Sequence, residues 1–265
     1  MLRRRKKTPK LVRHAAPGPA TGMRRRARPD AVVPPELVIR PAAPRKVVPA
    51  AGDVVLVTGF EPFGGEKVNP SWEICRRLPA TIAGLRVETM RVPCEFRRAV
   101  EVVAVAIERH RPALVVCIGQ AGGRSRIGVE RIAINVDDAR APDNAGAQPI
   151  DERIAPGGPP AYFSTLPVKA MVVAMREAGV PAELSNTAGT YVCNHLMYGV
   201  LHLLAASGSA VRAGFVHVPY SEAQVLDKAG LAAMSLESMA RGIEAGIAAA
   251  ARHERDIRIA EGTLD

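Results

Sequence analysis

From Asp53 onward the chain alternates between strand-like and helix-like segments, and this alternation is the feature that most constrains its fold. The expected strands are 53–60, 85–93, 113–120, 130–140, 181–187 and 213–220, and the expected helices are 70–79, 95–112, 167–179, 191–206 and a long alanine-rich helix near the C-terminus. The run ALVVCIGQ (113–120) is apolar almost throughout, as in a strand buried on both faces. We therefore predict an α/β domain built around a mainly parallel sheet.

Two segments do not fit this alternation. Residues 137–165 are rich in Asp, Gly and Pro and are too long for a simple connection, so we expect a functional loop there. Residues 1–50 hold 14 Lys/Arg against two acids, nine prolines and no serine, whereas the rest of the chain holds 22 basic and 24 acidic residues. Such a segment cannot bury enough apolar surface to order itself. We predict a disordered basic extension over 1–50 and a folded domain over 51–265.

The basic extension has several interpretations. It could bind nucleic acid or anionic lipid weakly, remain a solvated tail, or lie upstream of a second start at Met23. A mitochondrial transit peptide is disfavoured by the many prolines and the missing serines.

No stretch reaches the ~20 consecutive apolar residues of a membrane span. The four cysteines show neither a CxxC motif nor paired spacing, which argues against disulfides or a zinc site. We expect a cytoplasmic protein.

Cys193 differs from the other cysteines in its position. Cys75, Cys94 and Cys117 lie in or beside apolar segments, where a free thiol usually behaves as a small hydrophobic group. Cys193 instead follows the turn AGT and falls in the first turn of the expected helix 191–206. The free N–H groups and the dipole at a helix N-terminus stabilise a thiolate, so we predict a lowered pKa and a nucleophilic role.

A nucleophilic cysteine needs a general base, and histidine titrates nearest to neutral pH. His217 lies in the last strand, two residues before Pro219, where ligands of α/β proteins gather. His195 is the rival candidate, but two residues along a helix from Cys193 it points about 200° around the axis. We favour His217.

The base must be oriented by a carboxylate or an amide. Glu130 follows a glycine-rich loop and enters an expected strand, an unusual place for an unpaired charge. Its alternative role is to pair with Arg126 or Arg131 on the surface, and Asp137 and Asp138 compete for the orienting role.

Four stretches carry a resemblance to a known family. Residues 55–73 (VLVTGFEPFGGEKVNPSWE), 117–144 (CIGQAGGRSRIGVERIAINVDDARAPDN) and 187–202 (TAGTYVCNHLMYGVLH), together with 214–220 (GFVHVPY), resemble pyroglutamyl-peptidase I, a family of cysteine peptidases. The resemblance covers about 53–250. It implies a single three-layer α/β/α domain, often tetrameric and typically cytoplasmic, that removes N-terminal pyroglutamate from peptides.

The resemblance also implies site residues. It assigns Cys193 as nucleophile, His217 as base and Glu130 as orienting acid, in agreement with the choice made from the residues alone. Because pyroglutamate is a flat uncharged lactam, its pocket should have apolar walls and a few amide contacts. The expected substrate-binding residues are Phe60, Phe63, Asn69, Gln120, Arg140, Tyr191 and Val192. Cys94, Ala141 and Tyr191 stand where the family usually has threonine, a larger aliphatic residue and phenylalanine, which leaves the strictness of substrate choice open.

The expected reaction passes through a thioester acyl-enzyme and requires no metal or organic cofactor. Two rival functions remain at this stage. Similar open α/β sheets serve nucleoside phosphorylases, which would need phosphate-binding arginines and would tolerate alkylation of Cys193. A binding protein acting through the basic extension would show strongly salt-dependent contact with nucleic acid.

Overall fold

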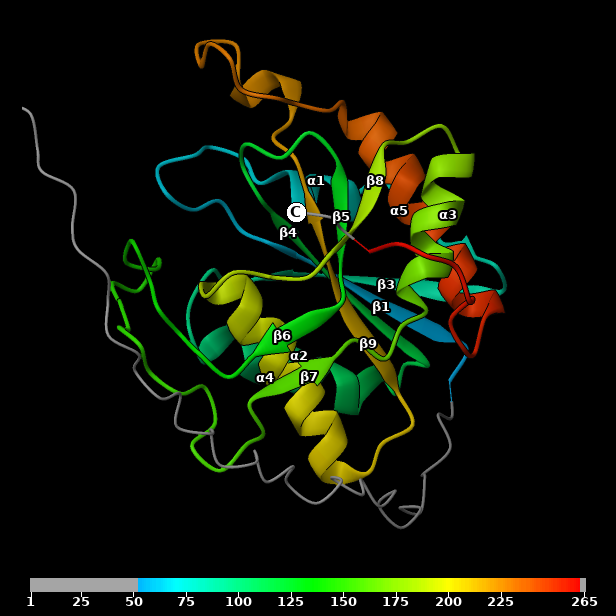
Figure 1. Ribbon diagram of the computed structural model, residues 1–265, viewed down its shortest axis with the longest axis horizontal. Coiled ribbons are helices and arrows are strands. Elements are labelled where there is room, and N and C mark those ends of the chain that lie inside the picture. Colours follow the sequence, from blue (N-terminus) through cyan, green and yellow to red (C-terminus); the bar gives the residue numbers. More distant parts are fainter. Residues whose placement is uncertain (1–51, 263–265) are drawn as a thin grey trace, which may run out of the picture. The chain divides into compact units, whose positions relative to one another are not determined.

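The computed structural model describes residues 52–262, and the elements alternate within them largely as expected (Figure 1). The predictions for residues 1–50 lie outside the described residues. Within residues 52–262, seven strands form one sheet in the order β2-β3-β1-β4-β9-β5-β8. They are β1 (Val54–Phe60), β2 (Thr81–Ile82), β3 (Leu85–Val92), β4 (Leu114–Gln120), β5 (Ile127–Glu130), β8 (Ala182–Ser185) and β9 (Arg212–Val218). The β3-β1-β4-β9 run and the β5-β8 pair are parallel, whereas β2 and β3, and β5 and β9, pair antiparallel. The mainly parallel sheet is confirmed.

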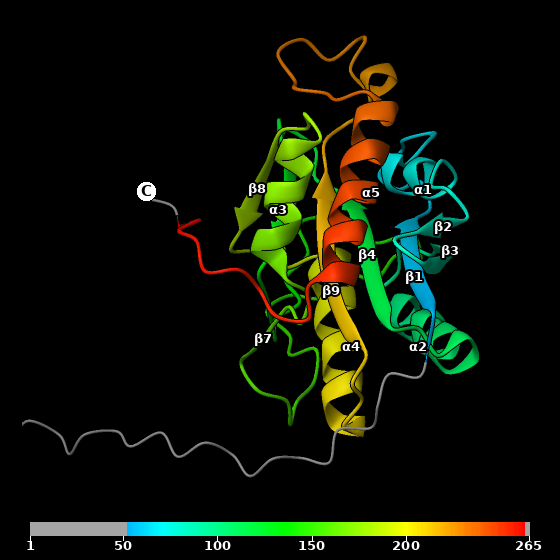
Figure 2. The same ribbon diagram turned by 90° about the vertical axis from the view of Figure 1, so that its right-hand side faces the viewer.

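Helices cover both faces of this sheet. They are α1 (Pro70–Cys75), α2 (Arg98–His110), α3 (Val168–Glu177), α4 (Val192–Ser207) and α5 (Leu236–Arg252), with a short 3-10 helix, η1 (Glu222–Gln224). The helices α1, α3 and α5 pack on one face, and α3 lies beside α5 (Figure 2). The helices α2 and α4 pack together on the other face. This is the expected three-layer α/β/α arrangement.

The strand β4 shows how one strand serves both cores. Leu114, Val116 and Ile118 join the core under α1, α3 and α5, whereas Val115 and Cys117 join the core under α2 and α4. All five side chains are buried. Burial of one such aliphatic side chain contributes about 1.5–3 kcal/mol, so the continuous apolar run stabilises both interfaces.

The expected strand 130–140 is wrong in its extent. The strand β5 ends at Glu130, and the chain then leaves the main sheet to form β6 (Ile132–Ile134), which pairs antiparallel with β7 (Ala161–Phe163). The buried carboxamide of Asn194 on α4 accepts from the N–H of Ile134 and donates to its carbonyl oxygen. Because α4 supplies these partners, the segment binds to a helix rather than continuing in the sheet.

Two further differences are local. The helix expected over 70–79 ends at Cys75, after which N–H groups bond to carbonyls three residues back, and Pro79 disfavours helical geometry in the residue before it. The segment 137–165 is mostly irregular, as expected, and a bridge between Asp137 and Glu152 pins its first half. Within residues 52–262, no helix combines the length and apolar composition needed to cross a bilayer.

Candidate active site

Cys193 is the second residue of α4, as expected from the sequence. The preceding Gly189 has a φ of 76°, a conformation that glycine adopts without strain, and Tyr191 is the N-cap but gives no side-chain cap. The N–H groups of Val192 and Cys193 have no acceptor among the described residues. The first turn of α4 therefore presents free donors beside the thiol.

The thiol lies over β4 at a position where that strand has no side chain. A Cβ added to Gly119 would lie 2.9 Å from Sγ of Cys193 and 2.7 Å from Cζ of Phe215. In the register of β4 and β9, the partner of Gly119 is His217. Paired residues of adjacent strands project to the same face, so Cys193 and His217 belong to one site on the α4 face of the sheet.

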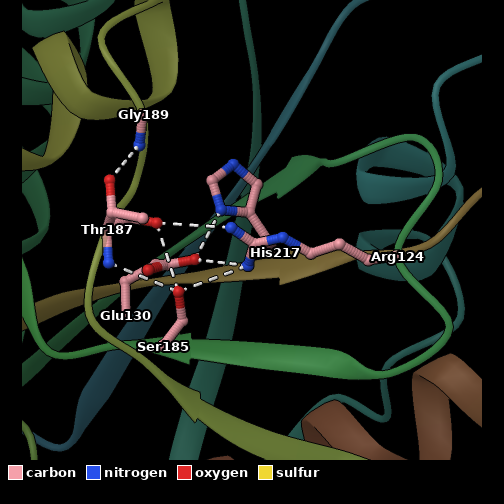
Figure 3. A network of polar contacts seen from close by, with 6 residues as sticks. All are labelled: Arg124, Glu130, Ser185, Thr187, Gly189 and His217. Carbon is pink, nitrogen blue, oxygen red and sulfur yellow. Dashed lines mark hydrogen bonds and ion pairs between the residues drawn. The ribbon is translucent and has the colours of Figure 1, made fainter. Parts of the chain in front are cut away.

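His217 and Glu130 form a buried pair. Nδ1 of His217 lies 2.7 Å from Oε1 of Glu130, and both side chains are almost fully enclosed. They are diagonal neighbours across the antiparallel strands, since Glu130 is opposite Phe215 and Gly128 is opposite His217. A carboxylate only accepts hydrogen bonds, so Nδ1 carries the proton and Nε2, which points away from Glu130, is free to accept one (Figure 3).

The arginine that pairs with Glu130 is not one of those expected. Nη1 of Arg124 lies 2.8 Å from the same Oε1 atom. Arg126 instead makes a loose exposed contact of 4.0 Å with Glu183, and no described acid pairs with Arg131. The alternative role of Glu130, a surface pair with Arg126 or Arg131, is wrong. Glu130 is fully buried, Arg126 contacts Glu183 instead, and Arg131 directly follows Glu130 and so projects to the opposite face.

The rival histidine has its own carboxylate. Nδ1 of His195 lies 2.7 Å from Oδ2 of Asp137, and Nε2 accepts from the backbone N–H of Arg97. Both ring nitrogens are therefore engaged, beside a cavity of about 360 Å³ that Phe96 also lines. Asp138 is exposed and forms no ion pair with a described residue. His195 joins α4, α2 and the 137–152 segment, and lies apart from the Glu130 pair.

The electrostatics of Cys193 differ from the expectation. Burial raises the pKa of its thiol well above the usual range, Cys94 and Glu130 raise it further, and Arg124 opposes them. The predicted lowering of this pKa is therefore wrong, because loss of water around the sulfur is the largest effect on it. The resting group is a thiol whose proton must pass to a base when it reacts.

The other three cysteines are core residues, as expected. Burial raises the pKa of Cys94 to about 12 and that of Cys117 to about 11, and it raises the pKa of Cys75 further. All three side chains are buried, whereas Cys193 is partly exposed. Cys193 is thus the least enclosed of the four cysteine residues.

The two expected ring-binding phenylalanines lie in different surroundings. Phe60 ends β1, is 2% exposed and packs against Phe215 with ring centroids 6.4 Å apart. Phe63 is half-buried, and its ring centroid lies 6.2 Å from that of Tyr191. The hydroxyl of Tyr191 donates to the carbonyl oxygen of Pro142. Phe63 and Tyr191 therefore form an aromatic rim beside the start of α4.

The remaining expected substrate-binding residues differ in burial and in the partners of their polar atoms. Asn69 is the N-cap of α1: its Oδ1 accepts from Ser71, and its amide donates to the carbonyl of Glu61. Oε1 of Gln120 accepts from the side chain of Gln224. Arg140 is exposed without a described ion-pair partner, and Val192 is fully buried. Asn69 shapes the loop that carries Phe63, whereas the amide N–H groups of Gln120 keep hydrogen-bonding capacity.

Sequence reasoning missed two contributors to this site. Arg124 and Gly128 lie in the expected glycine-rich loop and the strand that follows it, and neither was singled out. A lone glycine inside a strand often marks a close approach of another group, but the strand was expected to start at residue 130, whereas β5 starts at Ile127, so this signal did not point to Gly128.

The chain is similar to known proteins over most of its length. Residues 53–253 match the model of the family described as pyroglutamyl peptidase. The chain is 50% identical over 211 residues to a pyrrolidone-carboxylate peptidase of Yersinia pestis strain Pestoides F, covering 79% of this chain and 98% of that protein. The crystal structure of pyroglutamyl peptidase I from Bacillus amyloliquefaciens superposes with a TM-score of 0.76 at 43% identity, covering 78% of this chain and 98% of that one.

A pyrrolidone carboxyl peptidase from Thermococcus litoralis gives a TM-score of 0.75 at 40% identity, covering 78% of this chain and 98% of its own. These matches span the strands and helices that carry Glu130, Cys193 and His217. The chain therefore belongs to the pyroglutamyl peptidase family of cysteine peptidases.

Proposed function

We propose that Cys193, His217 and Glu130 form a catalytic triad that removes N-terminal pyroglutamate from peptides. The observation that carries this proposal is the buried Glu130–His217 pair, whose ring lies in register with Gly119 beneath the thiol. Family membership supports the choice of substrate, since the relatives are named for pyrrolidone carboxylate.

The first step is acylation of the thiol. Because the pKa of Cys193 is raised, the thiol is neutral at rest, and Nε2 of His217 takes its proton as the sulfur attacks the carbonyl that links pyroglutamate to the next residue. Glu130 accepts from Nδ1 and stabilises the imidazolium that forms. Free N–H groups at the start of α4 face the developing oxyanion.

The second step releases the product. The imidazolium returns its proton to the leaving amine, and the shortened peptide departs. Water then gives a proton to the neutral imidazole and attacks the thioester, which frees pyroglutamate and restores the thiol. In this scheme Arg140 stabilises the oxyanion, as the family resemblance suggests. Its side chain takes no part in the hydrogen bonds of Glu130, His217 and Arg124.

We assign the lactam ring to the region of Phe63 and Tyr191, which pack against the buried core that contains Phe60 and Val192. Their aromatic and aliphatic surfaces suit a flat uncharged ring. Gln120 offers its amide N–H groups to the lactam oxygen, while Asn69 holds the loop between β1 and α1.

We also propose a cytoplasmic peptidase that forms a tetramer. All four cysteines are free, which suits a reducing compartment. Sedimentation of the full-length chain tests the tetramer, and a single species of monomer mass would contradict it.

Hydrolysis of a fluorogenic pyroglutamyl-coumarin amide tests the function. The wild type should release coumarin, and Cys193→Ala should lose about 10⁴-fold or more in kcat. Two substrates serve for comparison: prolyl-coumarin, whose ring lacks the lactam oxygen and carries a protonated amine, and glutaminyl-coumarin, which is open-chain and also carries a protonated amine. Comparable turnover of all three, or activity retained by Cys193→Ala, would overturn the proposal.

A further inference from the structure

Arg124 lies between β4 and β5 and bonds to the carboxylate that holds His217. Its Nη1 lies 2.8 Å from Oε1 of Glu130, and that oxygen also accepts from Nδ1 of His217 (Figure 3). Glu130 is fully buried, and its second oxygen, Oε2, has no partner among the described residues. A single carboxylate oxygen therefore receives both the histidine and the arginine.

The path of Arg124 to this oxygen depends on Gly128. A Cβ at Gly128 would lie 2.5 Å from Nη1 of Arg124, closer than two such atoms approach. Gly128 is also opposite His217 in the antiparallel register of β5 and β9. Because Gly128 has no side chain, the guanidinium of Arg124 has room to cross β5 at the residue that is opposite His217.

The guanidinium also reaches the segment that leads into α4. Nη2 donates to the carbonyl oxygen of Thr187 at 3.3 Å, and Nη1 lies 3.4 Å from Oγ of Ser185. Ser185 Oγ donates to the same carbonyl, and the Thr187 hydroxyl accepts from the N–H of Gly189. Arg124 therefore joins the Glu130 carboxylate to the turn that precedes Cys193.

We propose that Arg124 is a positioning residue: it holds Glu130 as a charged acceptor for His217 and ties that carboxylate to the 187–189 turn. This proposal rests on the proposed function, because it assigns Arg124 a part in the same reaction. A buried carboxylate requires a compensating partner, and the planar fork of arginine can donate to two acceptors at once. Arg124 also acts on Cys193, whose pKa its charge lowers against the effect of burial.

Arg126 provides a matched control. It lies two residues further along the same loop, and its 4.0 Å contact with Glu183 involves side chains that are both about half exposed. Exposed pairs of this kind contribute little to stability. Loss of Arg126 removes the same charge from the same segment without touching Glu130.

The test compares Arg124→Met, Arg124→Gln, Arg124→Lys and Arg126→Met with the wild type. The readout is kcat/KM for the pyroglutamyl-coumarin amide across pH. Without the positive charge of Arg124, the His217–Glu130 pair binds a proton more readily. The acidic limb of the curve of kcat/KM against pH should therefore move to higher pH by about one unit in Arg124→Met and Arg124→Gln. We expect kcat to fall about 10²-fold, with KM within threefold. Arg124→Lys should keep the limb at its wild-type position and recover part of kcat, and Arg126→Met should match the wild type.

One outcome would show that Arg124 has a merely structural role and would overturn the proposal: Arg124→Lys, Arg124→Gln and Arg124→Met all lose the same activity, and the acidic limb of their pH profiles stays at the wild-type pH. Wild-type activity in Arg124→Met would also overturn it. Arg124→Met could fail to fold, which circular dichroism would detect. In that case Arg124→Lys, with a charged side chain, is compared with Arg124→Gln, with a neutral one.

A substrate-free measurement separates this proposal from the proposed function. The rate of Cys193 alkylation by iodoacetamide is followed against pH in the same variants. We expect its rise to shift to higher pH in Arg124→Met and Arg124→Gln, and to stay in place in Arg126→Met, since Arg124 is the cation that favours the thiolate. An unshifted profile counts against Arg124, whereas a wild type that fails to cleave the pyroglutamyl substrate counts against the function alone.

Discussion

Gly119 lies directly beneath Cys193: a Cβ at this glycine would approach the sulfur to 2.9 Å and the Phe215 ring to 2.7 Å. Gly119→Ala should therefore displace the thiol or the ring beside His217. We expect kcat for the pyroglutamyl-coumarin amide to fall about 10²-fold from misplacement, and stability to fall by about 1–3 kcal/mol from overpacking.

Gly157→Ala is the control for this change. No atom lies within 4 Å of a Cβ built at Gly157, and its φ is not in the left-handed region. Denaturant unfolding and steady-state kinetics of both variants check the prediction. Normal turnover in Gly119→Ala would mean that the sulfur does not react from its position over β4.

Alkylation should distinguish the four cysteines by exposure. Cys193 is partly exposed, whereas Cys75, Cys94 and Cys117 are each no more than 3% exposed. Iodoacetamide at neutral pH should modify Cys193 first and abolish activity in step with that labelling. Peptide mapping by mass spectrometry measures the order, and equal modification of all four thiols in the native protein would contradict it.

The buried cysteines predict a loss of stability at alkaline pH. The pKa of Cys117 is about 11 in the fold and 9.0 as a reference value, so between these values the unfolded chain binds fewer protons than the native one. The free energy of unfolding must then fall as pH rises. Between pH 8 and pH 10 this one group should cost about 1 kcal/mol.

Cys117→Ala isolates that contribution from the lysines and tyrosines that also titrate. The difference in unfolding free energy between pH 8 and pH 10 should be smaller in Cys117→Ala than in the wild type by about 1 kcal/mol. Urea unfolding at the two pH values provides the measurement. Identical pH differences in both proteins would show that Cys117 ionises equally in the folded and unfolded chains.

Removal of residues 1–50 should leave the chemistry intact. The family match begins at residue 53, and every residue of the proposed site lies between Phe60 and His217. We expect kcat/KM for the small substrate to stay within about twofold of the full chain. A truncated protein with a normal circular dichroism spectrum but no turnover would assign the extension a part in catalysis.

The parts of this structure that follow local rules are those that the sequence predicts. Strand and helix order depend on side-chain periodicity within a segment, and the position of Cys193 at the start of α4 follows from a turn and a helical pattern. The choice of His217 over His195 follows from the angle between neighbouring residues on a helix, and the separate pairing of His195 with Asp137 agrees with it.

The parts that were missed depend on contacts between distant segments. The antiparallel placement of β5 against β9 brings Glu130 and Arg124 to the face that carries His217, and no local pattern contains that register. The raised pKa of Cys193 depends on how much water the surrounding elements exclude. Both are properties of packing, so a charge list or a helix-terminus argument does not predict them.

The last prediction uses the two buried histidine–carboxylate pairs as controls for each other. Each pair joins Nδ1 of a histidine to one carboxylate oxygen at 2.7 Å, with Glu130 holding His217 and Asp137 holding His195. Glu130→Gln keeps an acceptor but removes the charge that stabilises the imidazolium, so kcat should fall by about two to four orders of magnitude.

Asp137→Asn makes the same chemical change at the other pair, where Nε2 of His195 accepts from the Arg97 N–H and no proton transfer is expected. It should cost about 1–3 kcal/mol of stability and leave kcat within a few-fold of the wild type. Steady-state kinetics and urea unfolding of both variants decide between the pairs. If Glu130→Gln turns over normally while Asp137→Asn is crippled, the orienting role belongs to Asp137 and the general base must be His195, because each carboxylate reaches only its own histidine.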